Sequence, residues 1–131
     1  MTNLLWLLSI HFVGDFLCQS NWMATNKSKS WSALTAHVSA YTAAFGLLLI
    51  RRPDSPSLLQ FLALTFALHF LTDAITSRIT ARLWFIQTWP NINPSSIHFD
   101  ARKRHWFFVA IGADQLIHAF CLAWTWKVCG L

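Results

Sequence analysis

Four long apolar segments alternate with short polar segments along the chain. The apolar segments cover about residues 3–20, 32–50, 58–79 and 105–128. Each is close to the roughly 20 residues that an α-helix needs to cross the hydrocarbon core of a bilayer. Prolines and an Arg pair in RRPDSPS end the second segment, because proline cannot continue a helix. The pattern predicts an all-α fold: a single polytopic membrane domain over residues 1–131, built as a four-transmembrane-helix bundle with an interfacial loop at about 83–104.

The composition agrees with a membrane protein. Of the 131 residues, 55% are hydrophobic and only 11% are charged. The net charge of +5 comes from predicted loops and helix flanks, where it suits anionic lipid headgroups. We therefore expect membrane lipids as partners and no nucleic acid, since no nucleic-acid-binding motif is present. Three cysteines, an odd number in apolar surroundings, are expected to pack as small hydrophobic side chains.

Basic residues are distributed unevenly between the two sides of the predicted bundle. The side of the first and third loops holds Lys27, Lys29, Arg78, Arg82, Arg102, Lys103 and Arg104. The opposite side holds Arg51, Arg52 and Lys127. The positive-inside rule therefore places both termini outside the cytoplasm. The first apolar segment lacks a basic flank and a small-residue cleavage site, so we expect a retained helix.

Histidine and aspartate recur at four-residue spacing inside these apolar segments. Residues four apart lie on one face of a helix, so each pair forms a polar stripe. The stripes are His11, Asp15 and Gln19 in the first helix, His69 and Asp73 in the third, and Asp114 and His118 in the fourth, and the second helix contributes His37. Alternation of the four helices brings all seven His and Asp residues to one depth, about 8–20 Å from the same end. Polar groups in membranes face the interior, so we expect one cluster.

The cluster needs a compensating charge. An Asp in the middle of a membrane helix costs about 2.5–3.5 kcal/mol, and the core of no predicted helix holds a Lys or Arg to neutralise it. The three alternatives are a bound cation, protonated histidines, or shared protons that leave the carboxyl groups neutral.

A metal site is the chemistry that fits this set best. Four imidazoles and three carboxylates can hold one Zn ion with an open position, or two ions bridged by an Asp. We expect a divalent metal, Zn or Mn, bound by His11, Asp15, His37, His69, Asp73, Asp114 and His118. Catalytic roles are predicted for Asp15, Asp73 and Asp114, one of them as general base, with Gln19, Thr72 and Gln115 orienting ligands. A single pair of this kind is more often a satisfied hydrogen bond, so the prediction depends on the coincidence of three.

The same motifs carry a family resemblance. HFVGDFLCQSNWMATNK, with the later AHVSAYT, HFLTDAITS and ADQLIH, resembles small bacterial and phage membrane proteins of the family called domain of unknown function 3307. The resemblance covers nearly the whole chain and implies a polar set of His11, Gly14, Asp15, Gln19, His37, His69, Asp73, Asp114, Gln115 and His118. It implies location in the bacterial inner (cytoplasmic) membrane and no established activity.

Three functions remain open at this stage. The first is a metal-dependent hydrolase acting on a lipid or lipid-like substrate, with Arg78 and Arg82 binding a lipid phosphate below the polar layer. The others are a proton or metal-ion pathway, and a non-catalytic membrane assembly protein held by His–Asp hydrogen bonds. The outer halves of the helices are nearly all apolar, which favours a closed site over a pathway. His98, Asp100 and His105 are expected at the interface, and a homo-oligomer is compatible with the sequence.

Overall fold

The structure, a computed structural model, describes residues 2–49, 56–88 and 105–131, and places side chains for 4–47, 57–85 and 105–131. Every regular element in these residues is a helix, which confirms the all-α prediction. The elements are α1 (Thr2–Phe12), the π-helix η1 (Val13–Leu17), α2 (Asn21–Asn26), α3 (Trp31–Leu49), α4 (Pro56–Thr88) and α5 (His105–Val128).

The first predicted helix is divided into shorter elements, which the apolar pattern did not predict. α1 changes to the π-helix η1 at Val13, and η1 ends at Leu17. The short helix α2 then occupies Asn21–Asn26, a stretch predicted as loop, so that prediction was wrong. Ser20 explains the start of α2, because its hydroxyl accepts a hydrogen bond from the backbone N–H of Met23 at 3.3 Å.

Helix α4 is longer than predicted. It has 33 residues, which corresponds to about 50 Å of helix, and it continues to Thr88. Residues 83–88 of the predicted interfacial loop are therefore helical, while 89–104, with His98 and Asp100, lie outside the described residues. The polar and aromatic residues after Ile79 mark a change of environment, but none of them breaks a helix.

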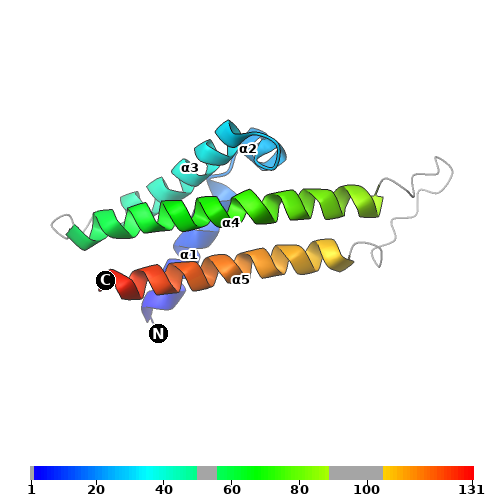
Figure 1. Ribbon diagram of the computed structural model, residues 1–131. Helices are drawn as coiled ribbons and strands as arrows, with labels where there is room; N and C mark the ends of the chain where they lie inside the picture. The colour runs from blue at the N-terminus through cyan, green and yellow to red at the C-terminus, as the bar shows by residue number, and fades with distance from the viewer. Residues whose placement is uncertain (1, 50–55, 89–104) are drawn as a thin grey trace.

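The long helices contact one another in a ring. α1 contacts α3 and α5, α3 contacts α4, and α4 contacts α5. Figure 1 shows α4 and α5 lying side by side while α1 and α3 cross them obliquely, and both chain ends lie near the C-terminal end of α5. Residues from all parts of the sequence therefore meet between these helices.

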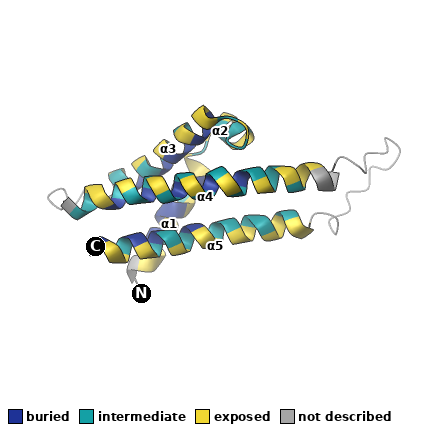
Figure 2. Cartoon of the chain, in the orientation of Figure 1, coloured by how far each residue is buried: buried dark blue, intermediate teal, exposed yellow. Residues whose placement is uncertain are grey.

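Ionisable and polar side chains lie in the interior beside apolar ones, while many large apolar side chains lie on the outside. Asp15, Asp73 and Thr125 are buried, whereas Leu71 and Phe120 are exposed on the outer faces of α4 and α5. Figure 2 shows exposed residues repeated along the described parts of both helices. Large exposed apolar surfaces mark contact with a membrane or a partner.

Two helices among the described residues are long and apolar enough to cross a membrane. They are α4 over Ser57–Phe85 and α5 over His105–Val128. The apolar stretch Leu4–Leu17 is shorter. The structure thus gives two candidate spans, fewer than the four predicted from sequence.

An apolar core closes one side of the interior. It contains Leu7, Ile10, Phe45, Phe61 and Leu122, all buried, with Phe45 packed edge-on against Phe61 at a ring-centroid distance of 5.8 Å. The polar cluster lies next to this core, because His11 and Tyr41 follow Ile10 and precede Phe45 on the same helices.

Candidate metal centre

The three predicted His/Asp pairs meet between the helices. η1 supplies Asp15, α3 supplies His37, α4 supplies His69 and Asp73, and α5 supplies Asp114 and His118. Within the pairs, a ring nitrogen lies 3.7 Å from a carboxylate oxygen for His69 and Asp73, and 3.5 Å for His118 and Asp114. The four-residue spacing thus brings these two pairs together on α4 and α5, whereas the third pair spans α1 and η1, with His11 Nε2 4.0 Å from Asp15 Oδ2.

Four of these side chains direct one atom each at a common region. Asp15, His37, His69 and Asp73 are all buried, and one potential ligand atom from each lies within 4.8 Å of the others. His37 Nε2 lies 3.2 Å from Asp15 Oδ1, 3.1 Å from Asp73 Oδ2 and 3.2 Å from His69 Nε2. Two imidazoles and two carboxylates in this arrangement can hold a divalent metal ion.

A second group shares one residue with the first. Asp73, Asp114 and His118 also offer ligand atoms within 4.8 Å of one another. Asp73 Oδ1 lies 3.5 Å from His118 Nε2, while Asp73 Oδ2 belongs to the first group. One Asp73 oxygen therefore faces each group, which is the arrangement of a carboxylate that bridges two ions.

Several buried polar atoms of the two ligand groups have no hydrogen-bond partner among the described residues. They are Asp15 Oδ1, His69 Nδ1 and both ring nitrogens of His118. A buried polar atom without a partner costs about 1–3 kcal/mol. A cation bound among these side chains would offset this cost for the atoms that face it, so the donor set fits a metal ion.

Two glutamines connect the acidic and imidazole groups. Gln115 Nε2 donates to Asp15 Oδ2 at 2.9 Å and to Asp114 Oδ2 at 3.2 Å. The Gln19 amide lies 3.3 Å from His37 Nδ1 and so fixes the orientation of that ring, leaving Nε2 to face the cluster. The structure thus brings both predicted glutamines into contact with the site.

Two other predicted residues lie differently from expectation. Thr72 takes part through its backbone: the Thr76 hydroxyl lies 2.9 Å from the Thr72 carbonyl and 2.5 Å from Asp114 Oδ1, so these two acceptors share its one proton. His11 is buried but lies outside both groups, since its Nδ1 is 2.9 Å from the Tyr41 hydroxyl and its Nε2 is 3.0 Å from Gln115 Oε1. The sequence assigned no role to Thr76, and Tyr41 was missed. Tyr41 follows His37 by four residues, so helical spacing contained the signal.

Lys27 is the largest departure from the sequence analysis. Its Nζ lies 2.9 Å from Asp73 Oδ2 and 3.4 Å from His37 Nε2. No Lys or Arg was expected within the helix cores, and Lys27 is consistent with that, because it lies in a connection. A basic side chain that reaches the carboxylates from a connection was not among the three sources of compensating charge considered from the sequence. Lys27 lies in the connection between α2 and α3, where the apolar pattern carries no information about which way the chain turns.

Gly14 allows η1 to approach α3 closely. A Cβ atom at Gly14 would lie 2.9 Å from Tyr41 Cδ2 and 3.3 Å from the Tyr41 backbone oxygen. Within η1 the N–H of Cys18 donates to the Val13 carbonyl at 2.9 Å, five residues back. π-helical turns are frequent at functional sites. Here the turn carries Asp15 directly after the glycine.

The two arginines expected to bind phosphate lie away from the cluster. The Arg78 guanidinium lies 4.2 Å from the centre of the Trp31 ring and donates to the Ala74 carbonyl. Arg82 is exposed. His105, the described member of the predicted interfacial group, is also exposed, with its ring against Trp106 at a centroid distance of 5.3 Å.

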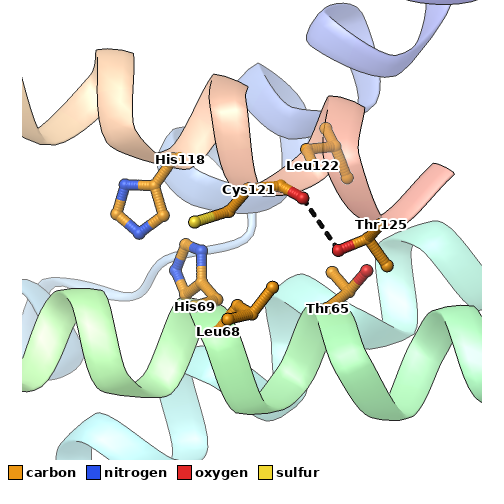
Figure 3. A pocket seen from close by; sticks show the side chains of 7 residues that line it. All are labelled: Thr65, Leu68, His69, His118, Cys121, Leu122 and Thr125. Atoms are coloured by element: carbon orange, nitrogen blue, oxygen red, sulfur yellow. Dashed lines mark hydrogen bonds between the residues drawn. The ribbon is translucent and has the colours of Figure 1, made fainter. Parts of the chain in front are cut away.

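Two cavities adjoin the cluster on opposite sides. The larger, about 170 Å³, is lined by Asp15, Asp73 and Asp114 together with Lys27 and Gln115. The smaller, about 10 Å³, lies behind His69 and His118, as Figure 3 shows. Its wall includes Thr125, whose hydroxyl donates to the Cys121 carbonyl at 2.8 Å. The acidic side chains therefore line a chamber large enough for several waters, and His69 and His118 line one with room for about one water.

A family model covers nearly the whole chain. The family described as "Protein of unknown function (DUF3307)" matches residues 3–130. No curated protein and no solved structure matches this chain. Its function must therefore be inferred from its own residues.

Proposed function

The chain belongs to the DUF3307 family, whose function is unknown, and we propose that it is a membrane protein that binds divalent metal ions and uses them for hydrolysis. The observation that carries the proposal is the convergence of Asp15, His37, His69 and Asp73, all buried, within 4.8 Å. Buried carboxylates and imidazoles without a full set of hydrogen bonds are the surroundings that a metal ion requires.

The first ion is assigned to the group of Asp15, His37, His69 and Asp73. Mixed nitrogen and oxygen ligands suit Zn or Mn, and we propose one of these. A second ion fits the group of Asp73, Asp114 and His118, with Asp73 as the bridge. Bound metal would supply a hydroxide at neutral pH and a positive charge for the substrate oxygen.

The acidic residues then have separate tasks. Asp15 and Asp73 are assigned as ligands whose negative charge balances that of the first ion. Gln115 keeps Asp15 oriented through the 2.9 Å hydrogen bond. Asp114 faces the 170 Å³ cavity and is the least buried of the three, so we assign it the role of general base. In hydrolysis the water oxygen bonds to the substrate phosphorus or carbonyl carbon while Asp114 receives the water proton. As the bond to the leaving oxygen or nitrogen breaks, Asp114 returns that proton to the leaving atom.

We place the chain in the bacterial cytoplasmic membrane with four spans and both termini outside. Support comes from the two helices long enough to cross and from the exposed apolar faces of α4 and α5. The basic residues Lys27, Lys29 and Arg82 lie near the acidic cavity end, which the positive-inside rule assigns to the cytoplasm. The substrate proposed for a site at this depth is a lipid or lipid-like molecule.

A proton or metal-ion pathway is less well supported. A pathway needs polar groups continuing to the other face, and the separate cavity beyond His69 and His118 has a volume of only about 10 Å³. Phe61 and Leu122, both buried, follow it in the apolar core. A site open on one side suits a reaction better than transport.

Metal content tests the proposal directly. The full chain, purified in mild detergent without chelator, is expected to contain one or two equivalents of Zn or Mn by elemental analysis. Asp73→Asn keeps the shape and removes the charge shared by both groups, so it should lose most of the metal. Thr125→Val is the matched control, because it also alters a buried polar side chain but lies in α5 away from both groups.

Two results would contradict the metal centre. A well-folded wild-type chain without metal, even after incubation with Zn and Mn, would leave proton sharing as the better account of the buried carboxylates. Equal metal in Asp73→Asn and in the wild type would remove Asp73 from the site.

A further inference from the structure

A second cleft adjoins the acidic cavity on the side of the basic loop. It has a volume of about 620 Å³ and lies between the α2–α3 connection, the second half of α4 and the start of α5. Lys27, Ser77 and Thr80 line both the cleft and the acidic cavity, so the two share a wall. A molecule in the cleft would therefore lie next to the proposed metal centre.

One side of the cleft is cationic and polar. Thr25, Ser28 and Lys29 line it, and no acidic residue is found among the described residues of the wall. Lys27 is already paired with Asp73, whereas Lys29 is exposed and has no ion-pair partner in the described part of the chain. The Lys29 ammonium is thus available to an anion, and ammonium groups with neighbouring hydroxyls bind phosphate well.

The other side is apolar and aromatic. Trp84 and Phe85 on α4 and Phe107 on α5 line it, with the Trp84 and Phe107 rings 5.0 Å apart. Trp84 is 42% exposed and Phe85 is 57% exposed. Aromatic side chains in this position suit the junction between lipid headgroups and acyl chains. The cleft therefore combines an anion-binding wall with a wall for hydrocarbon.

We propose that this cleft binds a membrane lipid whose phosphate headgroup carries a net negative charge, with the phosphate on Lys29 and the nearest part of the acyl chain on Trp84 and Phe107. The assignment of this lipid as the substrate rests on the proposed hydrolase function, whereas the binding site does not. Lys29 takes the phosphate-binding role that the sequence suggested for Arg78 and Arg82, since Arg78 is stacked on Trp31 and neither arginine lines the cleft.

Native mass spectrometry of the full chain in neutral detergent tests the site. The probes are phosphatidic acid, phosphatidylcholine with the same acyl chains, and inorganic phosphate. We expect one retained phosphatidic acid per chain, bound about 10-fold more tightly than phosphatidylcholine. A difference of this size corresponds to roughly one charge-assisted hydrogen bond. Lys29→Gln should abolish the preference and Lys29→Arg should keep most of it.

Arg82→Gln is the matched control for general attraction to anionic lipid. Arg82 is an exposed basic residue near the same end of α4, but it does not line the cleft. We expect this variant to keep the preference. Phe107→Ala should weaken the binding of both lipids by shortening the aromatic wall. A melting curve for each variant separates lost binding from lost folding.

Three outcomes would overturn the proposed lipid site. They are equal losses in Lys29→Gln and Arg82→Gln, equal retention of the two lipids by the wild type, and displacement of phosphatidic acid by inorganic phosphate at similar concentration. If the chain holds no metal but still binds phosphatidic acid through Lys29, the hydrolase proposal fails and the lipid site stands.

Discussion

At the scale of single residues, Lys27 changes the electrostatic account of the interior. Its ammonium lies 2.9 Å from Asp73 Oδ2, the oxygen that also faces His37 and His69. The Lys27 side chain is 18% exposed and that of Asp73 is 2% exposed, so the pair is largely shielded from water. Lys27 therefore contacts the same Asp73 oxygen that we propose as a metal ligand. The Lys27 ammonium and the metal ion would compete for this oxygen.

Lys27→Met tests this competition by removing the charge and keeping an apolar stem. In chelator-treated protein we expect the free energy of unfolding to fall by about 3 kcal/mol, because the buried Asp73 charge loses its partner. Metal should bind more tightly than in the wild type, since no ammonium has to leave Asp73. Chemical unfolding and metal titration provide the two measurements.

The control for this variant is Arg82→Met, which removes an exposed basic group away from the cluster. Neither stability nor metal affinity should change there by more than about 0.5 kcal/mol. If Lys27→Met were as stable as the wild type and bound metal no more tightly, the contact with Asp73 would have no energetic role.

At the scale of elements, the π-helix η1 and α3 form the tightest contact of the site. Gly14 makes it possible, because any larger residue would bring a Cβ to 2.9 Å from Tyr41 Cδ2 and 3.3 Å from the Tyr41 backbone oxygen. Asp15 follows directly on η1, and Tyr41 holds His11 through a 2.9 Å contact. The spacing between η1 and α3 therefore sets the position of one proposed metal ligand.

Gly14→Ala should separate these two elements. We expect a loss of about 1–3 kcal/mol of stability from overpacking, and lower metal occupancy because Asp15 moves with η1. Thermal melting and elemental analysis on the same preparation measure both effects.

Gly112→Ala on α5 is the matched control, for which we expect no loss of stability. A Cβ there meets nothing within 4 Å, so the change should be neutral or stabilise by up to about 1 kcal/mol through helix propensity. Unchanged stability and metal content in Gly14→Ala would show that η1 and α3 tolerate a wider spacing than the structure has.

At the scale of the whole molecule, ionisable side chains lie in the interior while large apolar side chains lie on the outer surface. His37, His69 and Asp73 are almost fully buried, while Leu59 is 74% exposed and Phe120 is 68% exposed. In water this arrangement would leave large apolar surfaces unprotected, whereas the membrane location that we propose would cover them with hydrocarbon. The orientation in that membrane would then decide which side receives the opening of the acidic cavity.

Cysteine labelling of intact bacterial cells tests that orientation. In a chain whose Cys18, Cys121 and Cys129 are replaced by Ala, Ser28→Cys should be protected from a membrane-impermeant reagent, and Ser55→Cys should react. Labelling of both after permeabilisation is the control for reactivity. The reverse pattern would place the acidic cavity and the lipid cleft at the outer face.

The sequence by itself determined the helical class, the spacing of the polar pairs and their common depth. These are local properties, because a period of 3.6 residues places His69 and Asp73, or Asp114 and His118, on one helix face whatever the helix packs against. Gln19 and Gln115 followed from the same spacing. Tyr41 could have been found in this way from His37.

Only the tertiary structure decided which of these groups face one another. The rotation of each helix about its axis separates His11 from the two groups and gives Asp73 one oxygen in each. Lys27 reaches Asp73 because α2, which is capped by Ser20, directs the chain back toward the cluster. Arg78 is positioned by its contact with the ring of Trp31. Such contacts join residues up to about a hundred positions apart, as Asp15 and Gln115 are. They are fixed by how helices and connections pack, which a single-chain pattern of polar and apolar positions does not specify.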